Sequence, residues 1–274
     1  MSPPPRRGRS GADATPGDAG GAFKGERIAK LLARAGICSR RDAERLVLAG
    51  RVSLEGRILD SPAINVTPGQ IVLVDGKPLP EAERRRLWCY HKPRGLMTTH
   101  KDPEGRATVF AALPADMPRV VSVGRLDLNS EGLLLLTNDG ALARRLEMPA
   151  TGWVRRYRVR VHGAPDAATL GRLAAGITIE GQAYGPITAL VDREQRSNTW
   201  LTVALREGKN REIRRVMEHL GLAVTRLIRV AYVPLQLGNL AAGEVRAVTA
   251  KVLADQLGPA GKETAAAAAP RRPA

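Results

Sequence analysis

Residues 124–140 read Gly-Arg-Leu-Asp-Leu-Asn-Ser-Glu-Gly-Leu-Leu-Leu-Leu-Thr-Asn-Asp-Gly. This stretch places one carboxylate, Asp127, in a polar loop between two buried elements. The β-branched-rich run at 120–123 predicts a strand before the loop, and the apolar run at 133–136 predicts a second strand after it. Residues 138–140, Asn-Asp-Gly, predict a hairpin-type turn at its end. Such loops often hold functional groups on a rigid scaffold, but on spacing alone an ordinary connecting loop remains the alternative.

The composition gives the chain a strong positive charge. It has 274 residues, enough for two modest domains, and a formal net charge of +16 from 43 Lys+Arg against 27 Asp+Glu. Arginine greatly outnumbers lysine, and arginine pairs bidentately with phosphate and stacks on bases, which favours a nucleic-acid partner. An arginine-rich genome would explain the choice of Arg over Lys. It would not explain the positive excess, which belongs mostly to the folded part of the chain.

Several classes of site are not supported. Cys38 and Cys89 are far apart and in no CxxC pair, so neither a disulfide framework nor a zinc ribbon is expected. No apolar run is long enough to cross a membrane, and the N-terminus lacks the apolar region of a signal peptide. The four histidines are scattered, and no metal cluster or Gly-rich phosphate loop is found. We therefore expect a cytoplasmic protein that uses no metal and no cofactor.

Residues 23–82 predict a small domain of two helices followed by strands. Apolar residues at helical spacing predict a first helix ending at Gly36; Ser39 predicts the start of a second, with Asp42 as its capping-box-like partner. β-like runs follow at 51–54, 57–59 and 71–74. Residues 1–22 before the domain, and 259–274 at the other end of the chain, have the composition of disordered tails.

The order of these elements, with Ala-Gly-Ile-Cys-Ser-Arg-Arg-Asp-Ala-Glu-Arg at 35–45, resembles the small RNA-binding domain named after ribosomal protein S4. The resemblance implies an RNA-binding face made of Arg40, Arg41, Arg45 and Arg51. For any one of these arginines, a solvated surface is the alternative. The Ser-Arg-Arg at the helix start suits phosphate best, because backbone amides and guanidinium groups converge there.

Residues 83–258 predict a larger domain that follows a polar linker at 80–86. Strands are predicted at 87–91, 120–123, 133–136, 157–161, 200–205 and 225–230. Helices are predicted at 141–147, 165–175, 211–220 and 249–257. This mixture indicates an α+β fold with a mainly antiparallel sheet.

Gly124-Arg125-Leu126-Asp127, followed by Glu131-Gly132-Leu-Leu-Leu-Leu-Thr137-Asn138-Asp139-Gly140, resembles the signature of the bacterial rRNA pseudouridine synthases of the RsuA/RluB type. The resemblance runs from about residue 27 to about residue 257. It implies that the second domain has the pseudouridine synthase catalytic fold and that Asp127 is the nucleophile. Ser130 stands where members usually carry threonine, so a hydroxyl is kept.

The same resemblance implies the rest of the site. Arg214, in the segment Glu-Gly-Lys-Asn-Arg-Glu-Ile-Arg-Arg at 207–215, is expected to form an ion pair with Asp127, holding it ionised and aimed. Tyr157 is expected to pack against the target base, with Ile213 in the same pocket; for both, a core position is the alternative. Arg125 is expected beside them. Lys92, Arg94, Lys209, Arg211 and Arg215 are expected to contact RNA.

These features predict site-specific isomerisation of uridine to pseudouridine in ribosomal RNA, with 23S rRNA favoured. The partner would be ribosomal RNA or a pre-ribosomal particle, bound by a monomer and captured electrostatically, with the target uridine flipped out of its stack. Two alternatives remain. A non-catalytic ribosome-assembly factor would not need Asp127, Tyr157 and Arg214 together. A carboxylate-dependent nucleoside hydrolase would need a second acid, and neither Glu131 nor Asp139 has an evident acid role.

Overall fold

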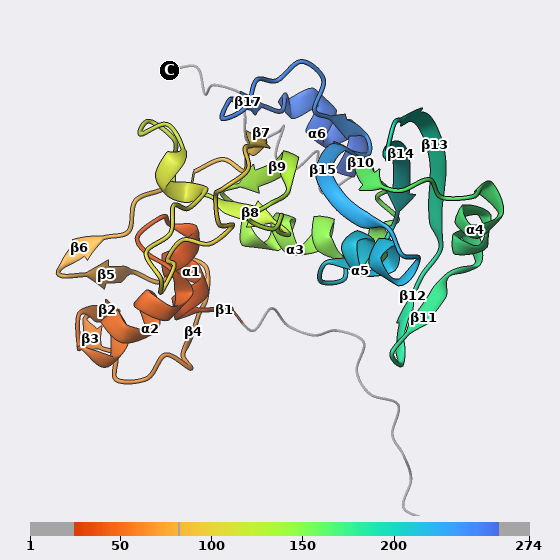
Figure 1. The fold of residues 1–274 in the computed structure, drawn as a ribbon. Coiled ribbons are helices and arrows are strands. Elements are labelled where there is room, and N and C mark those ends of the chain that lie inside the picture. The colour runs from red at the N-terminus through yellow and green to blue at the C-terminus, as the bar shows by residue number, and fades with distance from the viewer. Residues whose placement is uncertain (1–24, 82, 258–274) are drawn as a thin grey trace, which may run out of the picture. The chain divides into compact units, whose positions relative to one another are not determined.

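The computed structural model describes residues 25–81 and 83–257, which divide into two compact units between Pro80 and Glu81 (Figure 1). The two predicted tails, residues 1–22 and 259–274, lie outside the described residues. No described helix is long and apolar enough to cross a membrane. Each unit is described separately below.

The N-terminal unit is built on two helices, α1 (Ile28–Arg34) and α2 (Arg40–Leu48). The predicted cap is present, because the Ser39 side chain accepts a hydrogen bond from the Asp42 backbone N–H at 3.1 Å. The apolar faces of both helices pack with the following strands around Leu32, Ala43 and Val52, which are fully buried. The strands are β1 (Glu26–Arg27), β2 (Val52–Leu54), β3 (Arg57–Ile58), β4 (Asn65–Val66), β5 (Val72–Val74) and β6 (Lys77–Pro78), with sheet orders β3-β2-β5-β6 and β1-β4.

The second unit is organised around one nine-stranded mixed sheet of order β13-β14-β10-β15-β9-β7-β17. Within it, β8 pairs with β9 and β16 with β15, and every pairing is antiparallel except that of β9 with β15. The strands are β7 (Leu87–Lys92), β8 (Val121–Val123), β9 (Glu131–Thr137), β10 (Arg155–His162), β13 (Ile187–Gln195), β14 (Asn198–Leu205), β15 (Ala223–Tyr232), β16 (Leu235–Gln236) and β17 (Val245–Ala247), and a separate hairpin joins β11 (Ile177–Ile179) to β12 (Gln182–Tyr184).

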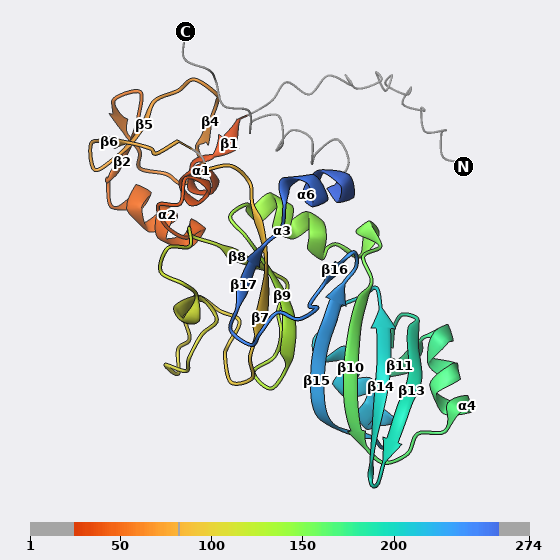
Figure 2. The same ribbon diagram turned by 90° about the horizontal axis from the view of Figure 1, so that it is seen from above.

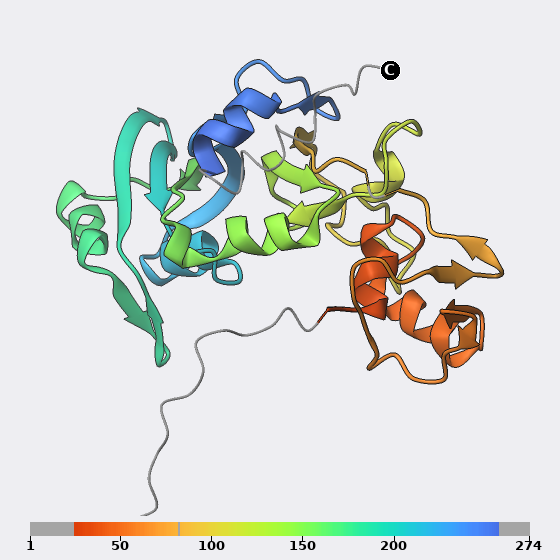
Figure 3. The ribbon, with the colours of Figure 1, turned by 180° about the vertical axis from the view of Figure 1, so that it is seen from behind.

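Helices cover this sheet on both faces. On one face, α4 (Ala167–Arg172) and α5 (Glu212–His219) pack over β10, β13 and β14, with Val159, Leu201 and Val216 in a shared core. On the other, α3 (Gly140–Glu147) and the C-terminal helix α6 (Ala250–Leu257), green and blue in Figure 3, pack over β7 and β9. The leucine run of β9 is therefore buried on both sides: Leu134 and Leu136 face one core, Leu133 and Leu135 the other.

The predicted α+β architecture is confirmed, but one local prediction is wrong. Residues 138–140 do not form a hairpin turn. The Asp139 side chain accepts hydrogen bonds from the backbone of Ala141 and Leu142, at 2.7 and 3.0 Å, and so caps α3. Asn-Asp-Gly suits a tight turn and a helix start equally well, and the helix-forming residues after it decide for the helix. The sequence patterns do not predict eight of the strands, which are β1, β4, β6, β11, β12, β13, β16 and β17.

Candidate active site

The turn that carries Asp127 is held from within the protein by Lys92, the last residue of β7. Its side chain is 0% exposed, and Nζ donates to the carbonyl oxygens of Pro93, Asp127 and Ser130 at 3.0, 3.1 and 2.9 Å. Burial lowers the pKa of Lys92 from 10.5 to about 8, against the opposing attraction of Asp127 and Glu131. An ammonium placed in this way positions the turn. It differs from the exposed RNA contact that the sequence predicted for Lys92.

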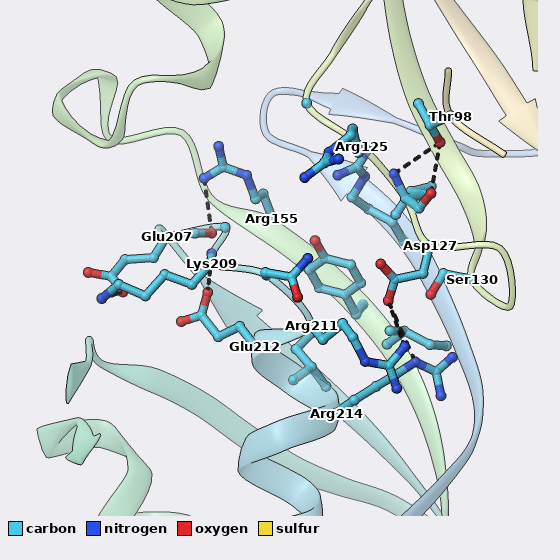
Figure 4. A pocket seen from close by; sticks show the side chains of 18 of the residues that line it. Thr98, Arg125, Asp127, Ser130, Arg155, Glu207, Lys209, Arg211, Glu212 and Arg214 are labelled. Carbon is cyan, nitrogen blue, oxygen red and sulfur yellow. Dashed lines mark hydrogen bonds and ion pairs between the residues drawn. The ribbon is translucent and has the colours of Figure 1, made fainter. Parts of the chain in front are cut away.

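Two further contacts fix the start of the loop. Thr98 Oγ1 donates to the carbonyl of Leu126 at 2.7 Å, and the Glu147 carboxylate accepts the backbone N–H of Gly124 at 2.7 Å. Gly124 has φ +65°, a left-handed conformation that glycine adopts without strain. Asp127 is thus anchored through its backbone on both sides, while its side chain, 32% exposed, points into the pocket (Figure 4).

Two arginines approach the Asp127 carboxylate from α5. Arg211 Nη1 lies 3.6 Å and Arg214 Nε 3.9 Å from Asp127 Oδ2 (Figure 4). Arg214 is the more buried, with 13% of its side chain exposed, and its other nitrogens donate to the carbonyls of Val224 and Asn129, both at 3.2 Å. Burial and the charge of Arg211 lower the pKa of Arg214, and Asp127 raises it. The backbone thus holds Arg214 in place, with its Nε toward the carboxylate.

Arg211 was predicted to contact RNA, and the structure places it beside Asp127 as well. It occupies the N-cap of α5 with φ +51°, a conformation that no sequence pattern signals. Arg215, one residue beyond Arg214, points elsewhere: a hydrogen bond to Tyr184 raises the pKa of Arg215. The arrangement agrees with the helical rotation of about 100° per residue.

The carboxylate opens into a cavity of about 770 Å³. Tyr157 and Ile213, which line it, are 8% and 5% exposed, so each belongs to the core and presents one side to the cavity. Arg125 and Lys209, both exposed, also line it. An apolar and aromatic surface beside the Asp127 carboxylate and its two guanidinium partners is suited to a planar, polar ring.

Three more carboxylates line the cavity, and the sequence analysis missed them as pocket residues. Glu147 accepts the amide of Gly124, Glu207 accepts that of Gly185 at 3.2 Å, and Glu212 accepts that of Lys209 at 2.9 Å. Glu212 is 4% exposed, and burial raises its pKa. The positions of Glu207 and Glu212 around Lys209 were visible in the sequence as a charged loop, but their inward direction depends on the fold.

The remaining predicted residues lie on the surface. Arg94 is exposed, and its charge contributes to lowering the pKa of Arg214. Arg40, Arg41, Arg45 and Arg51 are all exposed on the N-terminal unit. Arg45 pairs with Asp42 at 2.8 Å, and Arg51 pairs with Asp75 through two bonds of 2.8 and 2.6 Å.

Within residues 25–81 and 83–257, no cluster of three or more His, Cys, Asp or Glu side chains is arranged to hold a metal ion. The polar groups that line the cavity include carboxylates, guanidinium groups and the phenols of Tyr157 and Tyr232. Of these, the carboxylates can act as nucleophiles or as acids and bases.

Known protein families match both units of the chain. Residues 86–219 match the RNA pseudouridylate synthase family, and residues 26–72 match the S4 domain. An uncharacterized RNA pseudouridine synthase of Rickettsia prowazekii is 48% identical over 231 residues, covering 84% of this chain and 97% of the relative. The ribosomal large subunit pseudouridine synthase B of Escherichia coli O157:H7 is 43% identical over 221 residues, covering 78% of this chain and 76% of the relative.

A crystal structure of a pseudouridylate synthase superposes with a TM-score of 0.61 at 22% identity, covering 85% of this chain and 100% of the other, and so shares its fold. Sequence relatives and fold point to the same group. The chain belongs to the RNA pseudouridine synthases of the RsuA/RluB type, which carry an N-terminal S4 domain.

Proposed function

We propose that this enzyme isomerises uridine to pseudouridine in large-subunit ribosomal RNA, with Asp127 as the nucleophile. The assignment of Asp127 rests on the hydrogen-bond partners of its carboxylate, which differ from those of the other carboxylates in the cavity. Of the four carboxylates that line the cavity, Glu147, Glu207 and Glu212 each accept a backbone N–H. Asp127 is the one whose described partners are only guanidinium groups, at 3.6 and 3.9 Å. Those distances leave its oxygens able to approach a reacting atom.

The two arginines suit a nucleophilic carboxylate. A cation close to a carboxylate favours its charged form, which is the nucleophilic form. Neither arginine forms a close, directed hydrogen bond that would have to break before attack. Because Arg214 is fixed by the carbonyls of Val224 and Asn129, it provides a preorganised charge, as electrostatic catalysis requires.

Tyr157 and Ile213 suit a flipped uracil ring. Both are buried in the floor of the cavity and present apolar surface to it. Stacking on such a floor compensates part of the cost of unstacking the base from RNA, a few kcal/mol. The reaction then needs no added atom: the bond from N1 of uracil to C1′ of ribose breaks, the ring turns, C5 bonds to C1′, and the proton lost from C5 is balanced by the one gained at N1.

The names of the relatives support ribosomal RNA as the substrate. The curated relatives of known role act on the large ribosomal subunit, as their names state. An S4 domain and a formal net charge of +16 both suit binding to a large folded RNA. A non-catalytic assembly factor would not require a carboxylate such as Asp127, which faces a base-sized cavity and has only two arginines, at 3.6 and 3.9 Å, as its described partners.

The test is to map pseudouridines in ribosomal RNA from cells with and without the gene. We expect one or more large-subunit pseudouridines to disappear on deletion and to return with the wild-type gene. Asp127→Asn should fail to restore them while binding RNA normally. Glu218→Gln, which neutralises an exposed carboxylate on α5, should restore them. Unchanged maps on deletion would refute the substrate, and restoration by Asp127→Asn would refute the nucleophile.

A further inference from the structure

The part of the sheet formed by β10, β14 and β13 is covered on one face and open on the other. Helices α4 and α5 cover the face that carries Val159, Leu201 and Val203. Figure 2 shows α5 behind these strands, and no helix of the described residues in front of them. The cavity with Asp127 belongs to the covered face, since Tyr157, which lines it, alternates on β10 with residues of the open face.

Five arginines gather on the open face. Arg156, Arg158 and Arg160 occupy alternate positions of β10, so their side chains leave the same face about 6.6 Å apart along the strand. The strand register places Arg226 of β15 opposite Arg160, and it places Arg193 of β13 opposite Trp200, which itself lies opposite Arg160. We call these five residues the arginine face.

Few acids balance this charge. Asp192 lies 3.9 Å from Arg158, and Glu131 pairs with Arg226 at 2.6 Å. The described structure gives Arg156 and Arg193 no acidic partner, and both are exposed. The face as a whole is therefore positive, even with its own ion pairs counted.

The cross-strand neighbours of the arginines determine how far these side chains project from the sheet, and one arginine stacks on an aromatic ring. Ala204 and Ala231 lie opposite Arg156 on the two neighbouring strands. Thr202 and Ile228 lie opposite Arg158, and Leu190 of β13 lies opposite Thr202. Arg158 stacks over Trp200, with 4.8 Å from its guanidinium carbon to the ring centroid. The alanine neighbours of Arg156 leave its side chain projecting from the sheet. Stacking on Trp200 holds the guanidinium plane of Arg158 in place at little cost in side-chain entropy.

We propose that the arginine face is a second RNA-binding surface, which contacts backbone phosphates of a segment of the substrate RNA other than the one that enters the cavity. The proposal rests on the function proposed above, since it takes the same RNA as ligand. Phosphate is the ligand that the face fits: planar guanidinium groups at regular spacing on a flat, positive surface bind phosphate through paired N–H donors. A protein partner would be expected to bury apolar residues beside the charges. The exposed Leu190 lies on this face and Ile228 packs against the core, so the five arginines dominate the exposed surface, which favours phosphate.

The test uses the full chain and a long ribosomal RNA fragment. Arg156→Gln with Arg193→Gln removes two exposed charges that have no packing role. The matched control, Arg144→Gln with Arg172→Gln, removes two exposed charges from α3 and α4. A second variant, Arg158→Gln with Arg160→Gln, is measured together with its thermal unfolding, because Arg158 also stacks over Trp200. Affinity is measured by titration at several salt concentrations.

If both mutated arginines bind phosphate, the log–log salt slope of Arg156→Gln/Arg193→Gln should fall by about 1.4–1.8, at 0.7–0.9 for each lost contact. The control should keep the wild-type slope, and the single-turnover rate of the control at saturating RNA should equal that of the wild type. A slope equal to that of the control would overturn the proposal. Pseudouridine formation by the wild-type enzyme is measured separately. If the variant has a reduced salt slope but the wild-type enzyme forms no pseudouridine, the proposed reaction is refuted and the proposed binding surface is supported.

Discussion

Replacing Lys92 by methionine should change how the stability of the protein depends on pH. The ammonium is fully buried and donates to three carbonyl oxygens, two of them in the turn that carries Asp127. Methionine has a similar length and no charge, so the variant keeps most of the packing and loses only the ionisation and the three bonds. The turn should then hold Asp127 less firmly, and the rate of pseudouridine formation should fall at every pH.

The magnitude follows from the pKa of Lys92, which burial lowers from 10.5 to about 8. The folded pKa is below the unfolded one, so between these two values the unfolded chain binds more protons than the folded chain. The free energy of unfolding of the wild type therefore rises with pH across this window. At about 1.36 kcal/mol per pKa unit, the rise due to Lys92 should reach about 3 kcal/mol by pH 10.5. Below pH 8 the group is charged in both states and contributes no slope.

The assay is chemical denaturation of wild type and Lys92→Met from pH 7 to 10.5. Other groups titrate equally in both proteins, so the difference between the two free energies isolates Lys92. We expect that difference to grow in favour of the wild type as the pH rises above 8. Lys101→Met, at an exposed lysine, should give a difference that does not change with pH. A flat difference for Lys92→Met would refute the lowered pKa of Lys92 in the folded protein, and an unchanged rate of pseudouridine formation would refute the clamp on the turn.

Three further predictions test the pocket, the sheet and the N-terminal unit. Arg214→Ala should lower the single-turnover rate at saturating RNA by about a hundredfold, the scale for a preorganised charge, and Arg215→Ala should lower it much less; equal losses would exclude a special pair of Arg214 with Asp127. Gly132→Ala should destabilise the fold and lower the Tm, because the added Cβ would lie 2.3 Å from the Arg229 backbone oxygen in β15; a wild-type Tm would contradict this. Arg40→Gln with Arg41→Gln should reduce the log–log salt slope of RNA binding by about 1.4–1.8, and an unchanged slope would show that these arginines are only solvated.

The sequence predicts those elements whose signal is local. Ser39 and Asp42 predict the start of α2, and the leucine run predicts β9, because capping and hydrophobicity act within a few residues. Strand β13 escaped prediction because it is an edge strand with exposed residues on both faces, such as Leu190 and Val191, and therefore shows no clean alternation.

The residues of the site likewise include some that the sequence predicts and some that depend on the tertiary structure. Asp127, Tyr157 and Arg214 are expected from the family motifs, and the structure brings them to one cavity. The sequence predicts a surface cation at Lys92 because lysine is seldom fully buried, and only the carbonyls of a distant turn make its burial acceptable. Arg211 reaches Asp127 through a left-handed backbone conformation, which depends on tertiary contacts.

The parallel pairing of β9 with β15 ties the two halves of the sheet together through only two residue pairs, Ile228 with Glu131 and Arg229 with Gly132. Asp127 precedes β9, whereas its cations and Tyr157 come from the half that contains β10 and α5. No half of the sheet holds a complete set of these groups. A chain still being synthesised, or stalled with one half collapsed, therefore has a carboxylate without its counter-ions and no floor for a base. The complete set of groups therefore comes together only when the two halves of the sheet pair through β9 and β15.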